Sequence, residues 1–411
     1  MTAIEDRYQA YADLALDVGL SLQAGQQLWL SMPITAAPLA RVIAAAAYKR
    51  GARYVEMHWT DDEMTLARFE HAPRDSFDQF PIWHSDAMLA GARRGDAFLS
   101  IRGTDPQLLK DQDASLVTKM QRTAAGHRRE YLSYVTSHKV NWCVLSVPIP
   151  SWARQVFPDA SEDEAMTQLW DAIGTACRLD QADPVAAWNA HLTRLAERAA
   201  QLTQASYSAL RFAGPGTDLT VGLVHNHHWI GGQSTTDSGI TFTPNVPTEE
   251  VFSLPHKDRV DGIVAASKPL NYGGTLIEGI RVRFEAGRAV EVTADAGQSV
   301  MQGLIDTDEG SARLGEVALV PASSPISTSG ILFYNTLFDE NAASHVAVGK
   351  AYSECLSGGG GMTDEELAQH GVNDSLTHVD FMIGGPQMDV FGQHDDGSEE
   401  AVMEQGEWVT V

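Results

Sequence analysis

One stretch of the chain, residues 333–352, carries polar groups that can do chemistry among small and apolar neighbours. It contains Asp339, Glu340, Asn341, His345 and Tyr352. Small and apolar neighbours favour burial, so this mixture is typical of a buried polar site and not of a solvated face. Charged side chains are seldom buried without a partner. The stretch is therefore the first place to look for a catalytic or metal-binding centre.

Two further stretches extend the pattern. Glu316 heads an apolar run, and His378-Val-Asp380 begins another one. If residues 377–383 form a strand, His378 and Asp380 share one face, because side chains alternate along a strand. Charges on an otherwise apolar strand are costly to bury unless they are paired or bound to a metal. The cluster therefore predicts a metal site.

At these residues the chain resembles a known family, the thermophilic-type metallo-aminopeptidases, also called aminopeptidase T or aminopeptidase S. The similarity follows one order along the second half of the chain. The matching stretches are Asn245-Val-Pro-Thr-Glu-Glu250-Val-Phe, Leu314-Gly-Glu316-Val-Ala-Leu-Val-Pro, Asn335 to Tyr352, and His378-Val-Asp380-Phe-Met-Ile-Gly.

The resemblance implies a set of metal ligands and a catalytic tyrosine. It implies that the metal is held by Glu250, Glu316, Glu340, His345, His378 and Asp380. Four carboxylates and two imidazoles exceed what one four-coordinate zinc takes, so we expect two divalent ions, zinc, cobalt, manganese or magnesium. The resemblance implies that Glu316 bridges them. The resemblance also places Tyr352 at the site, where its hydroxyl binds a metal or donates to an oxyanion. A core tyrosine with a satisfied hydroxyl remains the alternative.

Sequence spacing limits which secondary-structure elements can hold these residues. Glu249 and Glu250 are adjacent, so on an extended chain only one of them can face a given site, and the resemblance assigns that role to Glu250. Glu340 and His345 are five residues apart, which predicts a loop leading into a strand or helix. The run His225-Asn-His227-His228 is a weak metal signal, and substrate contact or packing is the preferred interpretation.

The expected chemistry is hydrolysis of an N-terminal residue from an oligopeptide by a metal-activated water. Glu316, Glu340 and Tyr352 are the expected catalytic residues, with Glu340 moving the proton to the leaving amine if it is not itself a ligand. Another metal-dependent amidase or a carboxypeptidase on the same ligands, and a non-catalytic peptide-binding protein, are the alternatives.

Strands and helices alternate in the first half of the chain and short strands with glycine turns fill the second half. The sequence predicts an α/β protein in which residues 1–205 form a helix-covered, mostly parallel sheet. The resemblance implies that this domain gates access to the site and supports a dimer. Residues 206–411 are expected to form an α+β catalytic domain with a mixed or antiparallel sheet. Helices are predicted over residues 106–122 and 161–178, the latter with a capping box at Ser161 and Glu164.

Composition and net charge limit the classes of binding partner and the compartments that suit this chain. The formal net charge is −25, which disfavours nucleic acid and anionic membranes. Three scattered cysteines do not form a disulfide framework, and the first residues lack a signal-peptide pattern. We expect a soluble cytoplasmic enzyme without a membrane span, and the resemblance implies a homodimer.

Overall fold

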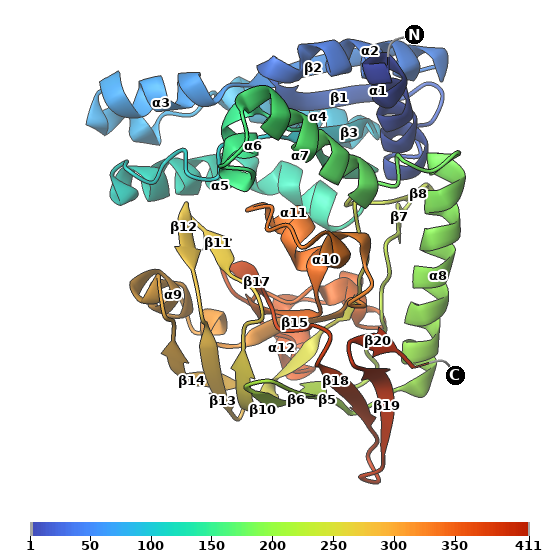
Figure 1. Ribbon diagram of the computed structural model, residues 1–411, viewed down its shortest axis with the longest axis vertical. Helices are drawn as coiled ribbons and strands as arrows, with labels where there is room; N and C mark the ends of the chain where they lie inside the picture. The colour runs from blue at the N-terminus through green and yellow to red at the C-terminus, as the bar shows by residue number, and fades with distance from the viewer. Residues whose placement is uncertain (1–2, 410–411) are drawn as a thin grey trace. The chain divides into compact units, whose positions relative to one another are not determined.

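The computed structural model describes residues 3–409 (Figure 1). The described residues pack as two compact units, the first formed by residues 3–191 and 233–247 and the second by residues 192–232 and 248–409. Helix α8 (Pro184–Ala205) therefore begins in one unit and continues into the other. The domain boundary expected at residue 205 stays a prediction.

The first unit is built on a four-stranded parallel sheet in the order β2-β1-β3-β4. Its strands are β1 (Gln27–Pro33), β2 (Tyr54–Thr60), β3 (Ala97–Arg102) and β4 (Trp142–Ser146), with a small pair formed by β7 (Ser234–Thr235) and β8 (Thr241–Phe242). Its helices are α1 (Ala3–Asp13), α2 (Ala37–Lys49), α3 (Asp62–His71), α4 (Ile82–Arg94), α5 (Ala114–Thr136), α6 (Pro150–Val156) and α7 (Glu162–Ala176), followed by the start of α8.

Local sequence accounts for several of these boundaries. The predicted capping box of α7 is present, with Ser161 and Glu164 exchanging hydrogen bonds across the first turn. The helix predicted over residues 106–122 is wrong in its start and its end. The Asp113 side chain accepts the backbone N–H of Ser115, so α5 begins only at Ala114, and it continues to Thr136.

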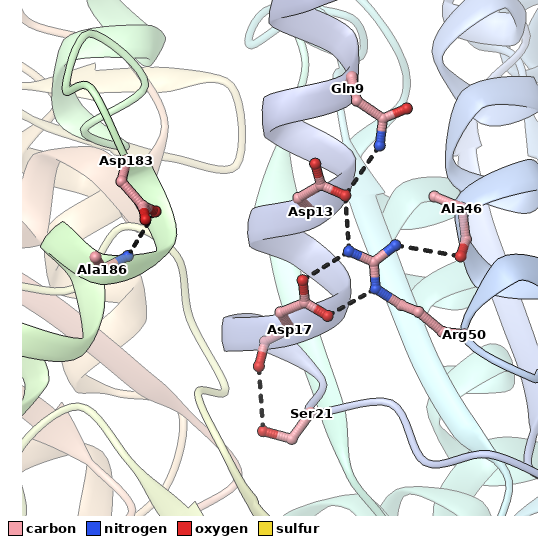
Figure 2. A network of polar contacts seen from close by, with 8 residues as sticks. All are labelled: Gln9, Asp13, Asp17, Ser21, Ala46, Arg50, Asp183 and Ala186. Atoms are coloured by element: carbon pink, nitrogen blue, oxygen red, sulfur yellow. Dashed lines mark hydrogen bonds and ion pairs between the residues drawn. The ribbon is translucent and has the colours of Figure 1, made fainter.

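An arginine joins the ends of two helical segments in this unit (Figure 2). Arg50 follows α2 and pairs with Asp13 at 2.7 Å and with Asp17 at 2.6 Å. The two carboxylates are four residues apart, Asp13 at the end of α1 and Asp17 in the π-helical turn that follows it (Leu14–Gly19), and both face the guanidinium. The side chain of Arg50 also donates to the carbonyl of Ala46, which fixes its direction.

The second unit contains two larger sheets. The eight-stranded sheet has the order β14-β13-β10-β6-β5-β18-β19-β20, and the four-stranded sheet has the order β17-β16-β15-β9. The eight strands are β5 (Ala209–Gly214), β6 (Thr217–Leu223), β10 (Pro255–Ala265), β13 (Arg281–Glu285), β14 (Arg288–Thr293), β18 (Asp389–Gln393), β19 (Glu399–Glu404) and β20 (Glu407–Trp408). The four are β9 (Val251–Ser253), β15 (Leu314–Leu319), β16 (His345–Gly349) and β17 (His378–Met382).

All pairings in these two sheets are antiparallel. The unit also holds the pair β11 (Leu270–Tyr272) and β12 (Thr275–Ile277), and the helices α9 (Gln298–Ile305), α10 (Pro325–Ser329), α11 (Thr336–Asp339) and α12 (Asp364–Gln369). A parallel, helix-bearing sheet followed by antiparallel sheets confirms the predicted fold class. Among residues 3–409, no helix combines the length and the apolarity needed to cross a bilayer.

Candidate metal centre

The four-stranded sheet brings the separate acidic and histidine stretches onto one face. Asp380 on β17 lies opposite Ala347 on β16, which lies opposite Glu316 on β15. His345 is two residues before Ala347, and His378 is two residues before Asp380, so both imidazoles face the same side. The predicted strand at residues 377–383 is confirmed as β17, and His345 begins a strand after the Glu340 turn, as expected.

Small residues separate the charged side chains on this face. Ala347 lies between Asp380 and Glu316, and Gly349 lies opposite His378. A bulge between Leu314 and Glu316 sets the phase of β15 relative to β16. Gly315 makes this bulge possible, because a Cβ atom there would lie 2.3 Å from the carbonyl oxygen of Gly349. The sheet thus has room above it between the carboxylates and imidazoles.

The side chains form two groups that share one glutamate. Glu250, Glu316 and His345 form the first group, and Glu316, His378 and Asp380 form the second, with the potential ligand atoms of each group within 4.8 Å of one another. The Nε2 atom of His345 lies 3.0 Å from Glu250 Oε2 and 3.4 Å from Glu316 Oε1. The Nε2 atom of His378 lies 3.6 Å from Glu316 Oε2 and 3.5 Å from Asp380 Oδ1. The two oxygens of Glu316 therefore point to different groups.

Backbone carbonyls orient both imidazoles. The Nδ1 atom of His345 lies 3.1 Å from the carbonyl oxygen of Ala343, and that of His378 lies 2.7 Å from the carbonyl oxygen of Lys350. With Nδ1–H donating to these oxygens, Nε2 is the nitrogen that faces the carboxylates; in the metal-free protein it is protonated and donates to them, and it would offer its lone pair to a bound ion. Metal-binding histidines are commonly held in this way.

The donor set fits divalent cations. Glu250 Oε2 and Asp380 Oδ1 are buried and accept no hydrogen bond of normal geometry, although each lies near an imidazole nitrogen. Such orphaned oxygens are costly unless a cation approaches them. Oxygen and imidazole donors together suit zinc, manganese, cobalt or magnesium.

The electrostatics show the same excess of negative charge. Burial, together with the nearby Asp380, raises the pKa of Glu316 to about 7, despite a hydrogen bond from His345 that opposes the shift. Burial would lower the pKa of His378, but the charge and hydrogen bond of Asp380 outweigh it and raise that pKa to about 10. Burial would likewise raise the pKa of Asp380, and the positive charge of His378 lowers it overall. The protonation state of each of these buried side chains therefore depends on the charges of its neighbours.

Glu340 and Tyr352 lie at the margin of the two groups. Glu340 sits in a 3₁₀ turn (Glu340–Ala342), and its pKa is raised by burial and by the charges of Glu250 and Asp380. It belongs to neither of the two ligand groups. Tyr352 follows β16, keeps 37% of its area exposed, and packs its ring 4.7 Å from the His378 ring. Its pKa is raised by burial and by Glu316.

Two neighbours of Glu340 hold its turn in place. The Asp339 carboxylate accepts the backbone N–H groups of Phe333 and Asn335 at 2.8 and 2.9 Å. Asn341 is fully buried; its Oδ1 accepts the N–H of Glu249 at 2.7 Å and its Nδ2 donates to Leu337 at 3.0 Å. Asn341 therefore ties the chain just before Glu250 to the chain just after Glu340.

Some residues near the site carried no specific sequence signal. Glu354 is one of these, and burial and Glu316 raise its pKa to about 7. Phe252 is another, although its two-residue spacing from Glu250 on an extended chain could have indicated a shared face.

Within the histidine run, Nδ1 of His227 bonds to the carbonyl oxygen of Val224 at 2.9 Å, and the run lies outside the two ligand groups. His58 and His84, separate in sequence, stack at 4.2 Å in the first unit.

Known proteins resemble the chain over nearly all of its length. Residues 4–408 match the family model described as thermophilic metalloprotease (M29). Aminopeptidase T of Thermus thermophilus is 45% identical over 409 residues, which cover 100% of both chains. Aminopeptidase 2 of Geobacillus stearothermophilus is 45% identical over 408 residues, 99% of each. The solved structure of wild-type AmpT from Thermus thermophilus aligns with a TM-score of 0.94 at 44% identity, covering 99% of this chain and 100% of that one.

Proposed function

Because the chain belongs to the thermophilic metalloprotease family M29, we propose that it is a metal-dependent aminopeptidase that removes N-terminal residues from oligopeptides. Membership confirms the resemblance that the sequence motifs carried. The observation that carries the proposal is the pair of carboxylate and imidazole groups sharing Glu316, built from the residues of those motifs.

We assign each group to one divalent ion. Glu250, Glu316 and His345 would hold one ion, and Glu316, His378 and Asp380 would hold the other, so that Glu316 would serve both groups. The divergent directions of the two Glu316 oxygens support this assignment. When bound, two such ions polarise a scissile carbonyl and acidify a water molecule so that it can act as the nucleophile.

The remaining polar groups move protons and stabilise charge. Glu340 lies beside both groups without joining either, which leaves its carboxylate to accept the proton of the attacking water and pass it to the leaving amine. If Glu340 instead completes a coordination shell, the proton passes through another carboxylate of the set. The Tyr352 hydroxyl donates a hydrogen bond to the oxyanion of the tetrahedral intermediate.

Hydrolysis of leucine p-nitroanilide tests the activity against its N-acetylated counterpart. Protein stripped with a chelator is returned to zinc, cobalt, manganese or magnesium before each assay. We expect cleavage of the free-amine substrate only, and only after metal returns. Cleavage of both substrates would favour a general amidase, and cleavage of neither under any metal would contradict the proposal.

Variants at the bridging position test the metal assignment. We expect Glu316→Ala to lose bound metal and turnover together, while the exposed Glu404→Gln keeps both. Metal content is read by atomic emission after gel filtration. A metal-free Glu316→Ala variant with wild-type activity would contradict the scheme.

We also propose that residues 1–205 restrict access to the site and support a homodimer, and that the enzyme works in the cytoplasm. The three cysteines are free and buried, which agrees with a reducing compartment. Equal rates on short peptides and on folded proteins would contradict the access role. Light scattering at several protein concentrations tests for the dimer, and a molar mass that stays equal to that of a single chain would contradict it.

A further inference from the structure

Phe252 places an aromatic ring on the same sheet face as the metal-binding groups. It lies on β9 opposite Ala318 of β15, and Ala318 lies opposite His345 of β16. Residues directly opposite each other on neighbouring strands share a face. Glu250 precedes Phe252 by two residues on the same extended segment, so both side chains project to this side.

The Phe252 ring lies at the border of a buried apolar cluster, on a backbone that is paired with Ile230. Phe252 exchanges two backbone hydrogen bonds with Ile230, at 3.0 and 2.9 Å. It packs, partly exposed, against a cluster that includes Leu254, Cys355 and Leu356. Its ring meets that of Tyr352 edge-on at 6.1 Å between centroids, and Tyr352 in turn contacts His378. A continuous aromatic surface therefore runs from β9 to the second ligand group.

This surface differs in chemistry from everything else identified around the centre. The ligand groups present carboxylates and imidazoles, whereas Phe252 and Tyr352 present ring faces and edges. A substrate whose amino-terminal residue reaches the ligand groups must lay that residue's side chain against neighbouring surface. Rigid aromatic side chains favour apolar and aromatic groups because both partners lose water on contact.

We propose that Phe252, together with the ring of Tyr352, forms the surface that receives the side chain of the substrate's N-terminal residue and selects large apolar or aromatic side chains. The inference rests on the proposed aminopeptidase function.

A panel of four p-nitroanilides tests the proposal on the metal-loaded enzyme: leucine, phenylalanine, alanine and glutamate. For the wild-type enzyme we expect kcat/KM for leucine and phenylalanine to exceed that for alanine by about 10- to 200-fold, as a few buried methylene groups provide. Glutamate should also be a poor substrate, because its charged side chain would lose water against an apolar surface. Equal rates on leucine and alanine would overturn the proposal.

Phe252→Ala is expected to lower kcat/KM for leucine and phenylalanine by roughly tenfold or more and to leave alanine within about twofold, while Phe252→Leu restores the leucine preference. Leu367→Ala is the matched control, because Leu367 packs on the same cluster from α12 and lies outside the aromatic contact. It should keep the wild-type ratios. An equal loss on all substrates in Phe252→Ala, or an unchanged leucine-to-alanine ratio, would overturn the proposal. A wild-type enzyme that cleaves none of the four would instead contradict the aminopeptidase function itself.

Discussion

Replacing Glu316 with glutamine should have opposite effects on the metal-free and the metal-loaded protein. In the metal-free protein, Glu316 is a buried carboxylate among other carboxylates, and burial with the nearby Asp380 raises its pKa from 4.5 to about 7. Glutamine is close in shape and stays neutral. The substitution therefore removes a charge that the metal-free fold holds at a cost.

The size and sign of the effect follow from that shift. A folded-state pKa raised by roughly 2.5 units corresponds to about 3 kcal/mol, at about 1.4 kcal/mol per unit. Below about pH 4.5 the carboxyl is protonated in both folded and unfolded chains, so it costs nothing there. The folded protein binds the proton more tightly between about pH 4.5 and pH 7, so the cost grows over this window and is complete above about pH 7. We expect metal-free Glu316→Gln to be about 3 kcal/mol more stable than metal-free wild type at pH 8, and equally stable at about pH 4.5.

Adding metal should reverse the order. A ligand at about a thousand times its Kd stabilises the folded state by about 4 kcal/mol, and the variant has lost the carboxylate whose two oxygens serve the two groups. Thermal unfolding at pH 4.5 and pH 8, with chelator or with zinc, measures all four conditions, and the exposed Glu404→Gln is the control. The reasoning is refuted if metal-free Glu316→Gln is the less stable protein at pH 8, or if zinc stabilises it as much as wild type.

Three further perturbations test other parts of the site. Gly315→Ala should destabilise the protein by about 3 kcal/mol or more in urea unfolding, because its Cβ would lie 2.3 Å from a carbonyl oxygen of the neighbouring strand. Gly303→Ala in α9, where a Cβ meets nothing within 4 Å, should be neutral or stabilising, and equal effects at the two glycines would contradict the packing argument. Asn341→Ala removes the buried amide that bonds the backbone of Glu249 and of Leu337, so we expect a loss of about 2–5 kcal/mol and weaker zinc binding by calorimetric titration, whereas Asn335→Ala removes the cap of α11, worth about 1 kcal/mol. Unchanged zinc affinity in Asn341→Ala would argue against its role in holding the site. Tyr352→Phe should lower kcat about 100-fold with bound metal unchanged, and a loss of metal would show instead that the hydroxyl is a ligand.

Local pattern was sufficient where the relevant geometry is local. The two-residue spacing of His378 and Asp380 predicted their common face, and β17 confirms it, because alternation is a property of any strand. The five-residue separation of Glu340 and His345 predicted a loop leading into a regular element, as observed. The start of α5 was mistaken because the cap at Asp113 depends on one side-chain hydrogen bond that a periodic apolar pattern does not reveal.

Sequence spacing alone could not predict the distances between the stretches that form the site. The resemblance supplied the residues of the two groups, but the 3.0 Å approach of His345 to Glu250 depends on strands that pair across many intervening residues. A slip of one residue in any of these strands would turn its charged side chain to the opposite face. The bulge at Gly315 fixes that register on β15, and nothing local to Glu316 predicts which strand Gly315 will touch.

The sequence by itself determined the family, the alternation of elements that makes the chain α/β, and the identity of the candidate ligands, because these depend on residue types and on order along the chain. The tertiary structure alone decided that Glu316 turns its two oxygens to different imidazoles, that Asn341 joins the segments of Glu250 and Glu340, and that Phe252 shares the face of the site. These features arise from packing between segments distant in sequence, and the free energy that holds them is shared among strands and loops that no short motif contains.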